Sequence, residues 1–301
     1  MENAQGGIVP EAGAFALYAL IKIKKDTLKV IDRCCDLASL AADIAHSQPG
    51  SQLKAAVSFS PAVCQSLSLS VPDDFSAFTS LGKKDAVAPA TDCDVLVHIH
   101  SERHDLNFHA LRALLAPIAD EVTVIDETYG YRYLDSRDMT GFIDGTENPK
   151  KYDARADVAI IKEGECTGGS VVLHQRYVHK LSAWEQLEVD KQEKIIGRTK
   201  ADSIELSEMP VDSHVGRVDI KEKGKGLKIV RHSLPYGTVS GEHGLLFLAY
   251  CNNQHNLDVM VKSMFGESDG NTDAMLRYSS AVTGAYMYAP STSQLATLSK
   301  R

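Results

Sequence analysis

The first half of the chain consists of short segments in which apolar residues recur either at alternate positions or at helical spacing. These two patterns predict strands at residues 15–24, 53–60, 93–101 and 121–135 and helices at residues 27–45 and 104–119. A further short helix is expected after Pro61, because proline is favoured in the first turn of a helix. Without that helix the order is β-α-β-β-α-β, which is typical of a ferredoxin-like unit.

The second half shows the same order of elements, although its residues do not repeat those of the first half. Strands are predicted at residues 168–181, 227–237, 244–252 and 284–290, and helices at residues 183–197, 256–266 and 273–280. The polar stretch Arg198–Gly226 interrupts this unit, and loops of that length are usually functional or disordered. Residues 291–301 are expected to form a polar tail. We therefore predict an α+β fold with two ferredoxin-like domains, at residues 1–136 and 137–301.

Composition and charge exclude several classes of function. Of the 301 residues, 44% are hydrophobic and 24% are charged, which is ordinary for a globular protein. The formal net charge of −8 argues against a nucleic-acid partner, because binding to phosphates needs a basic face. No apolar run reaches the roughly 20 residues of a membrane-spanning helix, and no leader pattern is visible at the N-terminus. The six cysteines form no C-x-x-C pair, so reduced thiols and a cytoplasmic location are expected.

The segment Thr140–Lys150, TGFIDGTENPK, holds one acid between an apolar pair and a glycine. Asp144 could cap a turn, with its carboxylate accepting main-chain N–H groups while Gly141 and Gly145 adopt positive φ. A turn has no need of two apolar residues directly before the acid, however. An acid held on a tight and partly apolar loop is suited to proton transfer. Position alone favours the turn cap.

Histidine and arginine residues provide further candidates. His98 and His100 lie two apart on an expected strand and share a face, but no nearby carboxylate completes a metal site of known spacing. His214 stands alone in the polar stretch; it is either a surface histidine or the axial ligand of a haem, which needs no local partner motif. Arg231 lies in an apolar strand, where it must face solvent or pair with an anion.

The segment GFIDGTENP, at Gly141–Pro149, resembles the G-x-x-D-G-T-x-N-P signature of the dye-decolorising peroxidases. Further blocks follow in the order which that family shows, namely IIGRTKADSIEL, DSHVGR, IVRHSLPYG, GLLFLAYCNN and YSSAVTGAYMYAP. The resemblance covers essentially the whole chain and is greatest to the compact bacterial branch. It implies that the duplicated ferredoxin-like β-α-β-β-α-β units form a dimeric-type α+β barrel, with one haem b in the second unit.

The resemblance also implies roles for individual residues. His214 is similar to the axial ligand of the haem iron, Asp144 to the acid and base on the opposite face, and Arg231 to the arginine beside it. Asp144 would move a proton between the oxygens of hydrogen peroxide, and Arg231 would stabilise the developing negative charge. The resulting oxyferryl intermediate would oxidise aromatic or dye-like reductants one electron at a time. Asp273 resembles the carboxylate that hydrogen-bonds the axial histidine, although Asp212 is nearer in sequence.

Other haem contacts are expected around these residues. Arg198 is suited to pair with a haem propionate, because guanidinium and carboxylate groups form paired hydrogen bonds. The motif and the apolar segments provide further expected contacts, at Ile143, Gly145, Thr146, Leu246, Phe247, Leu248, Met260, Met264 and Phe265. For at least half of the six from the apolar segments, ordinary packing in the core is the expected alternative. Bulky reductants cannot reach a buried haem, so we expect a radical relay through Tyr129 and Tyr236.

A rival hypothesis also assumes a bound haem but assigns the protein a different function. A haem-binding protein for storage or iron release would show peroxidase activity only incidentally. The pairing of Asp144 with Arg231 favours the enzyme, because a carrier has no need of an acid and base beside an open coordination position. The expected partners are therefore hydrogen peroxide and a small aromatic reductant, without nucleic acid or membrane. Self-association as a homodimer or a larger homo-oligomer is also expected.

Overall fold

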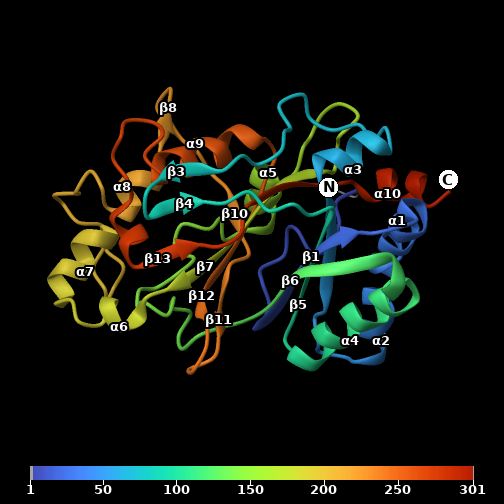
Figure 1. Cartoon of the computed structure of the whole chain (residues 1–301), viewed down its shortest axis with the longest axis horizontal. Helices are drawn as coiled ribbons and strands as arrows, with labels where there is room; N and C mark the ends of the chain where they lie inside the picture. The colour runs from blue at the N-terminus through green and yellow to red at the C-terminus, as the bar shows by residue number, and fades with distance from the viewer. Residues whose placement is uncertain (1–2, 301) are drawn as a thin grey trace.

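The structure, a computed structural model, describes residues 3–300 and is built around one antiparallel sheet of ten strands (Figure 1). The strand order is β10-β12-β11-β6-β1-β5-β2-β14-β7-β13, and β12 also pairs with β7. Because this extra pairing joins strands near the two ends of the sheet, the sheet is closed into a barrel. The predicted α+β barrel is therefore confirmed.

The first half of the chain forms the first ferredoxin-like unit, from β1, β2, β5 and β6 with helices α1, α2 and α4. The elements of this half are β1 Phe15–Ile23, α1 Thr27–Cys35, α2 Leu37–Ser47, β2 Lys54–Phe59, α3 Pro61–Ser66, β3 Leu81–Lys83, β4 Ala86–Ala88, β5 Val95–Ser101, α4 His104–Leu115, η1 Ala116–Glu121 and β6 Val122–Tyr131. The four strands that the alternating pattern predicted are all present.

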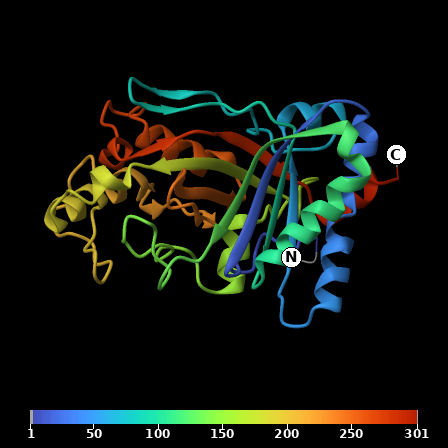
Figure 2. The same cartoon turned by 60° about the horizontal axis from the view of Figure 1, so that its bottom comes forward.

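The second half forms the second unit and also sends a helix back to the first. Its elements are α5 Tyr152–Ala159, β7 Ser170–His179, α6 Leu181–Trp184, α7 Val189–Ile196, α8 His214–Val218, β8 Lys221–Glu222, β9 Lys225–Gly226, β10 Val230–Arg231, β11 Leu234–Gly237, β12 His243–Cys251, α9 Gln254–Met264, η2 Ala274–Arg277, β13 Ser279–Ala281, β14 Ala285–Ala289 and α10 Thr292–Leu298. Figures 1 and 2 show α10, in red, lying beside the blue helices of the first unit.

The two units share one topology. In the first, the order β6-β1-β5-β2 places the fourth strand beside the first, followed by the third and the second. In the second, the order β14-β7-β12-β11 repeats that arrangement. Pairs of strands from different units, β6 with β11 and β2 with β14, then join the units into the barrel. The duplication predicted from the order of elements is thus visible in the sheet itself.

Both faces of β1, β2, β5 and β7 are largely buried, which explains their nearly continuous apolar sequences, whereas β6 is exposed along much of its length. On β1, Leu17, Ala19 and Ile21 pack against the helices of the first unit, whereas Tyr18 and Leu20 point into the barrel. In the second unit, the outer faces of β7 and β12 meet α9 and provide one side of a cavity. No helix within residues 3–300 is long and apolar enough to cross a membrane.

Several predicted elements are divided or differ in type. The helix expected at residues 27–45 is broken at Asp36 into α1 and α2, and the helix expected at 183–197 becomes α6 and α7. The helix expected at 273–280 is instead the 3-10 helix η2 followed by the strand β13. The strand expected at 227–237 is interrupted after β10, where the side chain of Ser233 replaces a main-chain group in accepting the N–H of Leu248. Residues 291–301 were expected to be a polar tail, but a capping box of Ser291 and Gln294 begins α10.

Candidate active site

A cavity lies between the outer face of the second unit's sheet and the helices α8 and α9. It contains about 1640 Å³ of space free of protein atoms, including its open mouth. Successive strand residues face opposite sides, so alternate residues of β7 and β12 line this cavity, namely Leu173, Gln175, Tyr177, His179, Leu245 and Phe247. Most of the remaining wall comes from the Thr140–Lys150 segment, α8, α9 and the segment around β10, and residues at 138, 196–205 and 273–279 complete it.

One wall of the cavity carries His214, the first residue of α8. Ser213 caps this helix, and its Oγ accepts the N–H of Gly216 at 3.2 Å. Nδ1 of His214 lies 2.7 Å from Oδ2 of the buried Asp273, whereas the Asp212 carboxylate accepts from Arg277. This hydrogen bond fixes the ring and leaves Nε2 as the nitrogen available to a ligand. Burial lowers the pKa of His214, but the Asp273 carboxylate outweighs it, so the net pKa is raised.

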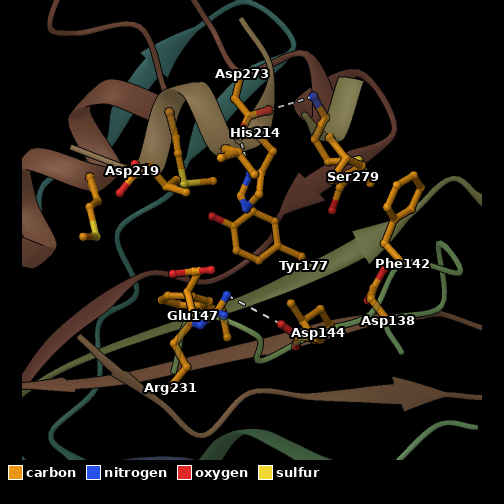
Figure 3. Close-up of a pocket in the computed structure, with 18 of the residues that line it drawn as sticks. Asp138, Phe142, Asp144, Glu147, Tyr177, His214, Asp219, Arg231, Asp273 and Ser279 are labelled. Carbon is orange, nitrogen blue, oxygen red and sulfur yellow. Dashed lines mark hydrogen bonds and ion pairs between the residues drawn. The ribbon is translucent and has the colours of Figure 1, made fainter. Parts of the chain in front are cut away.

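The opposite wall carries Asp144 and Arg231. Figure 3 shows these two side chains across the cavity from His214 and Asp273. Nη1 of Arg231 lies 3.5 Å from Oδ1 of Asp144, and the two side chains are 24% and 27% exposed. The loop also uses the acid locally, because Oδ1 of Asp144 accepts the N–H of Gly145 at 2.6 Å. Asp144 is therefore both the cap of its turn and a carboxylate on the cavity wall.

Charged residues gather at one end of the cavity, around Arg198. Its guanidinium donates to Oγ1 of Thr146 at 2.8 Å and to the carboxylates of Glu147 at 2.7 Å and Glu205 at 2.6 Å. The hydrogen bond from Arg198 lowers the pKa of Glu147. Arg198 lines the cavity as expected, but two glutamates already accept from it. The pairing of Arg198 with a haem propionate stays a prediction, and the propionate would compete with these two glutamates for the guanidinium.

Most of the predicted contact residues lie on the cavity wall, and some do not. Those that line it include Ile143, Gly145, Thr146, Phe247, Met260 and Met264. Leu246 and Leu248 point into the barrel instead, because they alternate with Leu245 and Phe247 along β12, and Phe265 packs in the core beside α9. The alternation of faces along β12 was enough to distinguish Phe247, which faces the cavity, from Leu246 and Leu248, which face the barrel interior.

The two tyrosines predicted to relay an electron lie outside the cavity wall. Tyr236, on β11, is one residue removed from it: its hydroxyl donates to the main-chain oxygen of Tyr177 at 3.1 Å and accepts from Arg176 at 3.0 Å. Tyr129, on β6 of the first unit, donates instead to the carboxylate of Glu127. Of the two, only Tyr236 has a direct connection to a residue of the wall.

Sequence reasoning missed the polar groups at the other end of the cavity. Nε2 of His179 lies 3.1 Å from Oδ1 of Asp138, and Nδ1 of His179 lies 2.8 Å from Oγ of Ser279. Burial raises the pKa of Asp138, but His179 and Thr140 outweigh it and lower that pKa to about 2. Only the alternation of residues along β7, which puts His179 on the same face of the strand as Tyr177, could have indicated that His179 lines the cavity.

The histidines on β5 belong to the interior of the barrel. His98 and His100 are buried, and their ring centroids lie 5.1 Å apart. Nδ1 of His98 pairs with the hydroxyl of Tyr250 at 3.0 Å, and His232 packs against both rings. Among residues 3–300 there is no group of three or more histidine, cysteine or acidic side chains placed to hold a metal ion. A two-histidine metal site therefore gains no support.

The fold and the site define an α+β barrel enzyme in which an acid and a guanidinium face one available imidazole nitrogen across an apolar cavity. The sequence profile of the N-terminal domain of Dyp-type peroxidases matches residues 5–132, and that of the C-terminal domain matches residues 135–294. The chain belongs to the Dyp-type peroxidase family. It is accordingly an oxidoreductase of the peroxidase class.

Individual relatives agree with this assignment. A dye-decolorizing peroxidase of Mycolicibacterium paratuberculosis is 39% identical over 85% of this chain and 74% of that protein. The solved structure of a dye-decolorizing protein from V. cholerae matches with a TM-score of 0.96 and 52% identity over 99% of both chains. A variant of Rhodococcus jostii DypB, solved in complex with heme, matches with a TM-score of 0.91 and 32% identity over 97% of both chains.

Proposed function

We propose that this protein is a haem b peroxidase that uses hydrogen peroxide to oxidise bulky aromatic or dye-like reductants in one-electron steps. The observation that carries the proposal is the placement of His214 opposite Asp144 and Arg231 across the cavity. The peroxidase class follows from the family, and the heme in the structure of the Rhodococcus jostii relative supports the cofactor.

The residues of the cavity fit a haem. Nε2 of His214 would bind the haem iron, and Phe247 and Met260 would provide apolar surfaces against the macrocycle. Arg198 and Lys228 lie at one end, where they would pair with the haem carboxylates in competition with Glu147 and Glu205. The free space of the cavity, which opens to solvent at its mouth, lies beside these groups. We therefore assign one haem b per chain to this cavity.

The protein's own residues provide the proton chemistry. A bound haem supplies an iron that takes up the oxidising equivalents of peroxide and passes them on one electron at a time. Asp144 accepts a proton from one peroxide oxygen and delivers it to the other, so that water can leave. Arg231 donates to the oxygen on which negative charge develops. Asp273 accepts the Nδ1 proton of His214 and keeps the lone pair of Nε2 directed at the cavity.

The rival function, haem storage or iron release, can be separated from the enzyme by rapid mixing with peroxide. A peroxidase loaded with haem should show a fast change in its Soret band that reverses when an aromatic reductant is added. A carrier should show slow, irreversible bleaching with loss of haem. A His214→Ala variant should bind haem weakly, which tests the axial ligand independently.

Other features of the proposal concern the protein's surroundings. We infer a cytoplasmic location, in keeping with six free cysteines, and cell fractionation tests it. We also infer a homodimer or larger homo-oligomer, which light scattering on the purified protein would measure. The boundary between the two domains is proposed at residues 136 and 137, in the loop between β6 and α5.

A further inference from the structure

We infer that Asn148 is a positioning residue that fixes Asp144 and Arg231 relative to one another, a conclusion that rests on the proposed function of this pair. The Asn148 carboxamide makes two hydrogen bonds to the main chain of Arg231. Its Nδ2 donates to the Arg231 carbonyl oxygen at 2.7 Å, and its Oδ1 accepts the Arg231 N–H at 2.8 Å. Asn148 does not itself line the cavity.

The main chain of Arg231 is available because β10 is an edge strand. Among residues 3–300, β10 is the first strand in the sheet and pairs only with β12. The N–H groups of consecutive strand residues point to opposite sides, and that of His232 donates to Leu248 of β12 at 2.8 Å. The N–H and carbonyl of Arg231 therefore point away from β12, toward the unpaired side. Asn148 occupies that side and satisfies both groups as a neighbouring strand would.

The other end of this connection is the loop that carries Asp144. The N–H of Asp144 donates to the Ser136 carbonyl oxygen at 3.0 Å, and the N–H of Asn148 donates to the Gly145 carbonyl oxygen at 3.1 Å. The loop is thus held at the acid by Ser136 and closed by a turn that ends at Asn148. From that turn the carboxamide reaches Arg231. The 3.5 Å separation between the reacting groups is consequently set through Asn148.

The chemistry of the carboxamide makes this position specific. An asparagine side chain offers one acceptor and one pair of donors, which match an N–H and a carbonyl group on the same residue. Aspartate has the same shape but no donor, so one of its oxygens would face the Arg231 carbonyl oxygen. Alanine would leave both main-chain groups without their partner. Both substitutions should release Arg231 from the loop.

The test compares haem-loaded Asn148→Ala and Asn148→Asp with the wild-type protein. The rate constant for reaction with peroxide should fall by ~10- to 100-fold, since displacing a reacting group by about 1 Å has effects of this size. The dissociation constant of fluoride from the haem-loaded protein, measured by absorbance, should rise, because Arg231 would no longer be placed to donate a hydrogen bond to the bound anion. The haem content and the KM for the reductant should stay unchanged. The matched control is Asn256→Ala, which removes a carboxamide that donates to the Lys228 carbonyl oxygen at 2.9 Å.

A double-mutant comparison separates positioning from a general loss of stability. If Asn148 acts through the reacting pair, adding Asn148→Ala to Asp144→Asn should cause little further loss in the rate. The inference is overturned if Asn148→Ala and Asn148→Asp react with peroxide at the rate of Asn256→Ala, or if the losses multiply in the double variant. If Asn148→Ala does not fold, Asn148→Asp decides alone. If Asp144→Asn itself reacts at the wild-type rate, the proposed function fails instead.

Discussion

Single residues in this site serve structural and chemical purposes together. Asp144 accepts the N–H of Gly145 and so stabilises the turn on which it lies, yet the same carboxylate faces Arg231 on the cavity wall. Asp273 similarly caps η2 through Oδ1 while its Oδ2 orients His214. In both cases the local hydrogen bond holds the carboxylate where the longer-range interaction requires it. A residue that looks like a turn or helix cap can therefore also belong to the chemistry.

Tyr236 allows a prediction about where bulky reductants are oxidised. Its hydroxyl is hydrogen-bonded to the main chain of Tyr177 on the cavity wall, so the expected relay would leave the cavity through this buried side chain. Tyr236→Phe should lower the turnover of a bulky dye severalfold, while the reaction of the haem-loaded protein with peroxide keeps its wild-type rate. Tyr129→Phe is the comparison. If both variants turn over the dye at the wild-type rate, neither tyrosine relays electrons from the reductant.

The sequence could predict some of these residues and not others. Asp144, His214 and Arg231 were recognised because they lie in short motifs of the family. The pair of Asp138 with His179 joins positions 41 apart, and neither residue lies in a local pattern that predicts a pocket. Such contacts depend on which strand faces meet in the folded chain. They become visible only when the register of the sheet is known.

At the level of elements, the start of α8 depends on the end of α7. α7 ends at Ile196 and is capped by Gly197, whose φ of 94° favours glycine. A Cβ there would lie 2.5 Å from Sδ of Met209 and 3.0 Å from Oγ of Ser213, the residue that caps α8 in front of His214. Gly197 thus allows the two helices to meet beside His214.

Gly197→Ala should therefore destabilise the protein and weaken haem binding together. We expect a loss of roughly 2–3 kcal/mol in the free energy of unfolding, from backbone strain and the displaced segment. The control is Gly224→Ala, because Gly224 has a φ of 77° but open space around it. Urea denaturation and haem titration would measure the two effects. Equal losses of stability and of haem affinity in both variants would show that the close contacts around Gly197 do not contribute to either property.

Elements were predicted best where one pattern extended over a whole strand. β1, β5 and β12 lie close to their predicted bounds because apolar residues mark them along their length. The division of the strand containing Arg231 was not predictable, because it depends on the Ser233 side chain replacing a main-chain partner. The helix α10 was missed although its capping box is a local signal.

At the scale of the whole molecule, the barrel encloses several histidines that the proposed reaction does not use. His98, His100, His174 and His232 are all buried, and burial lowers the pKa of each. For His100 and His174 the pKa falls to about 4. The unfolded chain, with ordinary histidine pKa values near 6.5, therefore binds protons before the folded chain does. Stability that is fully present above pH 6.5 is lost as the pH falls toward 4.

This linkage predicts acid sensitivity of the cofactor-free protein. The free energy of unfolding should decrease between pH 6.5 and pH 4, by at most about 3 kcal/mol for a histidine shifted as far as His100. Replacing His100 with phenylalanine should reduce the slope of stability against pH in this window. The same replacement at the exposed His46 provides the control. An unchanged slope in His100→Phe, measured by urea denaturation at several pH values, would contradict the prediction.

The central claim is that Asp144 moves the proton of peroxide beside a haem held by His214. The most direct measurement is the rate constant for the reaction of the haem-loaded protein with peroxide, by rapid mixing, in the wild-type protein and in Asp144→Asn. The account predicts a fall of ~10²- to 10⁴-fold, the usual contribution of a general acid and base. The exposed Asp153→Asn should react like the wild type. An Asp144→Asn variant that binds haem fully and reacts at the wild-type rate would contradict the account.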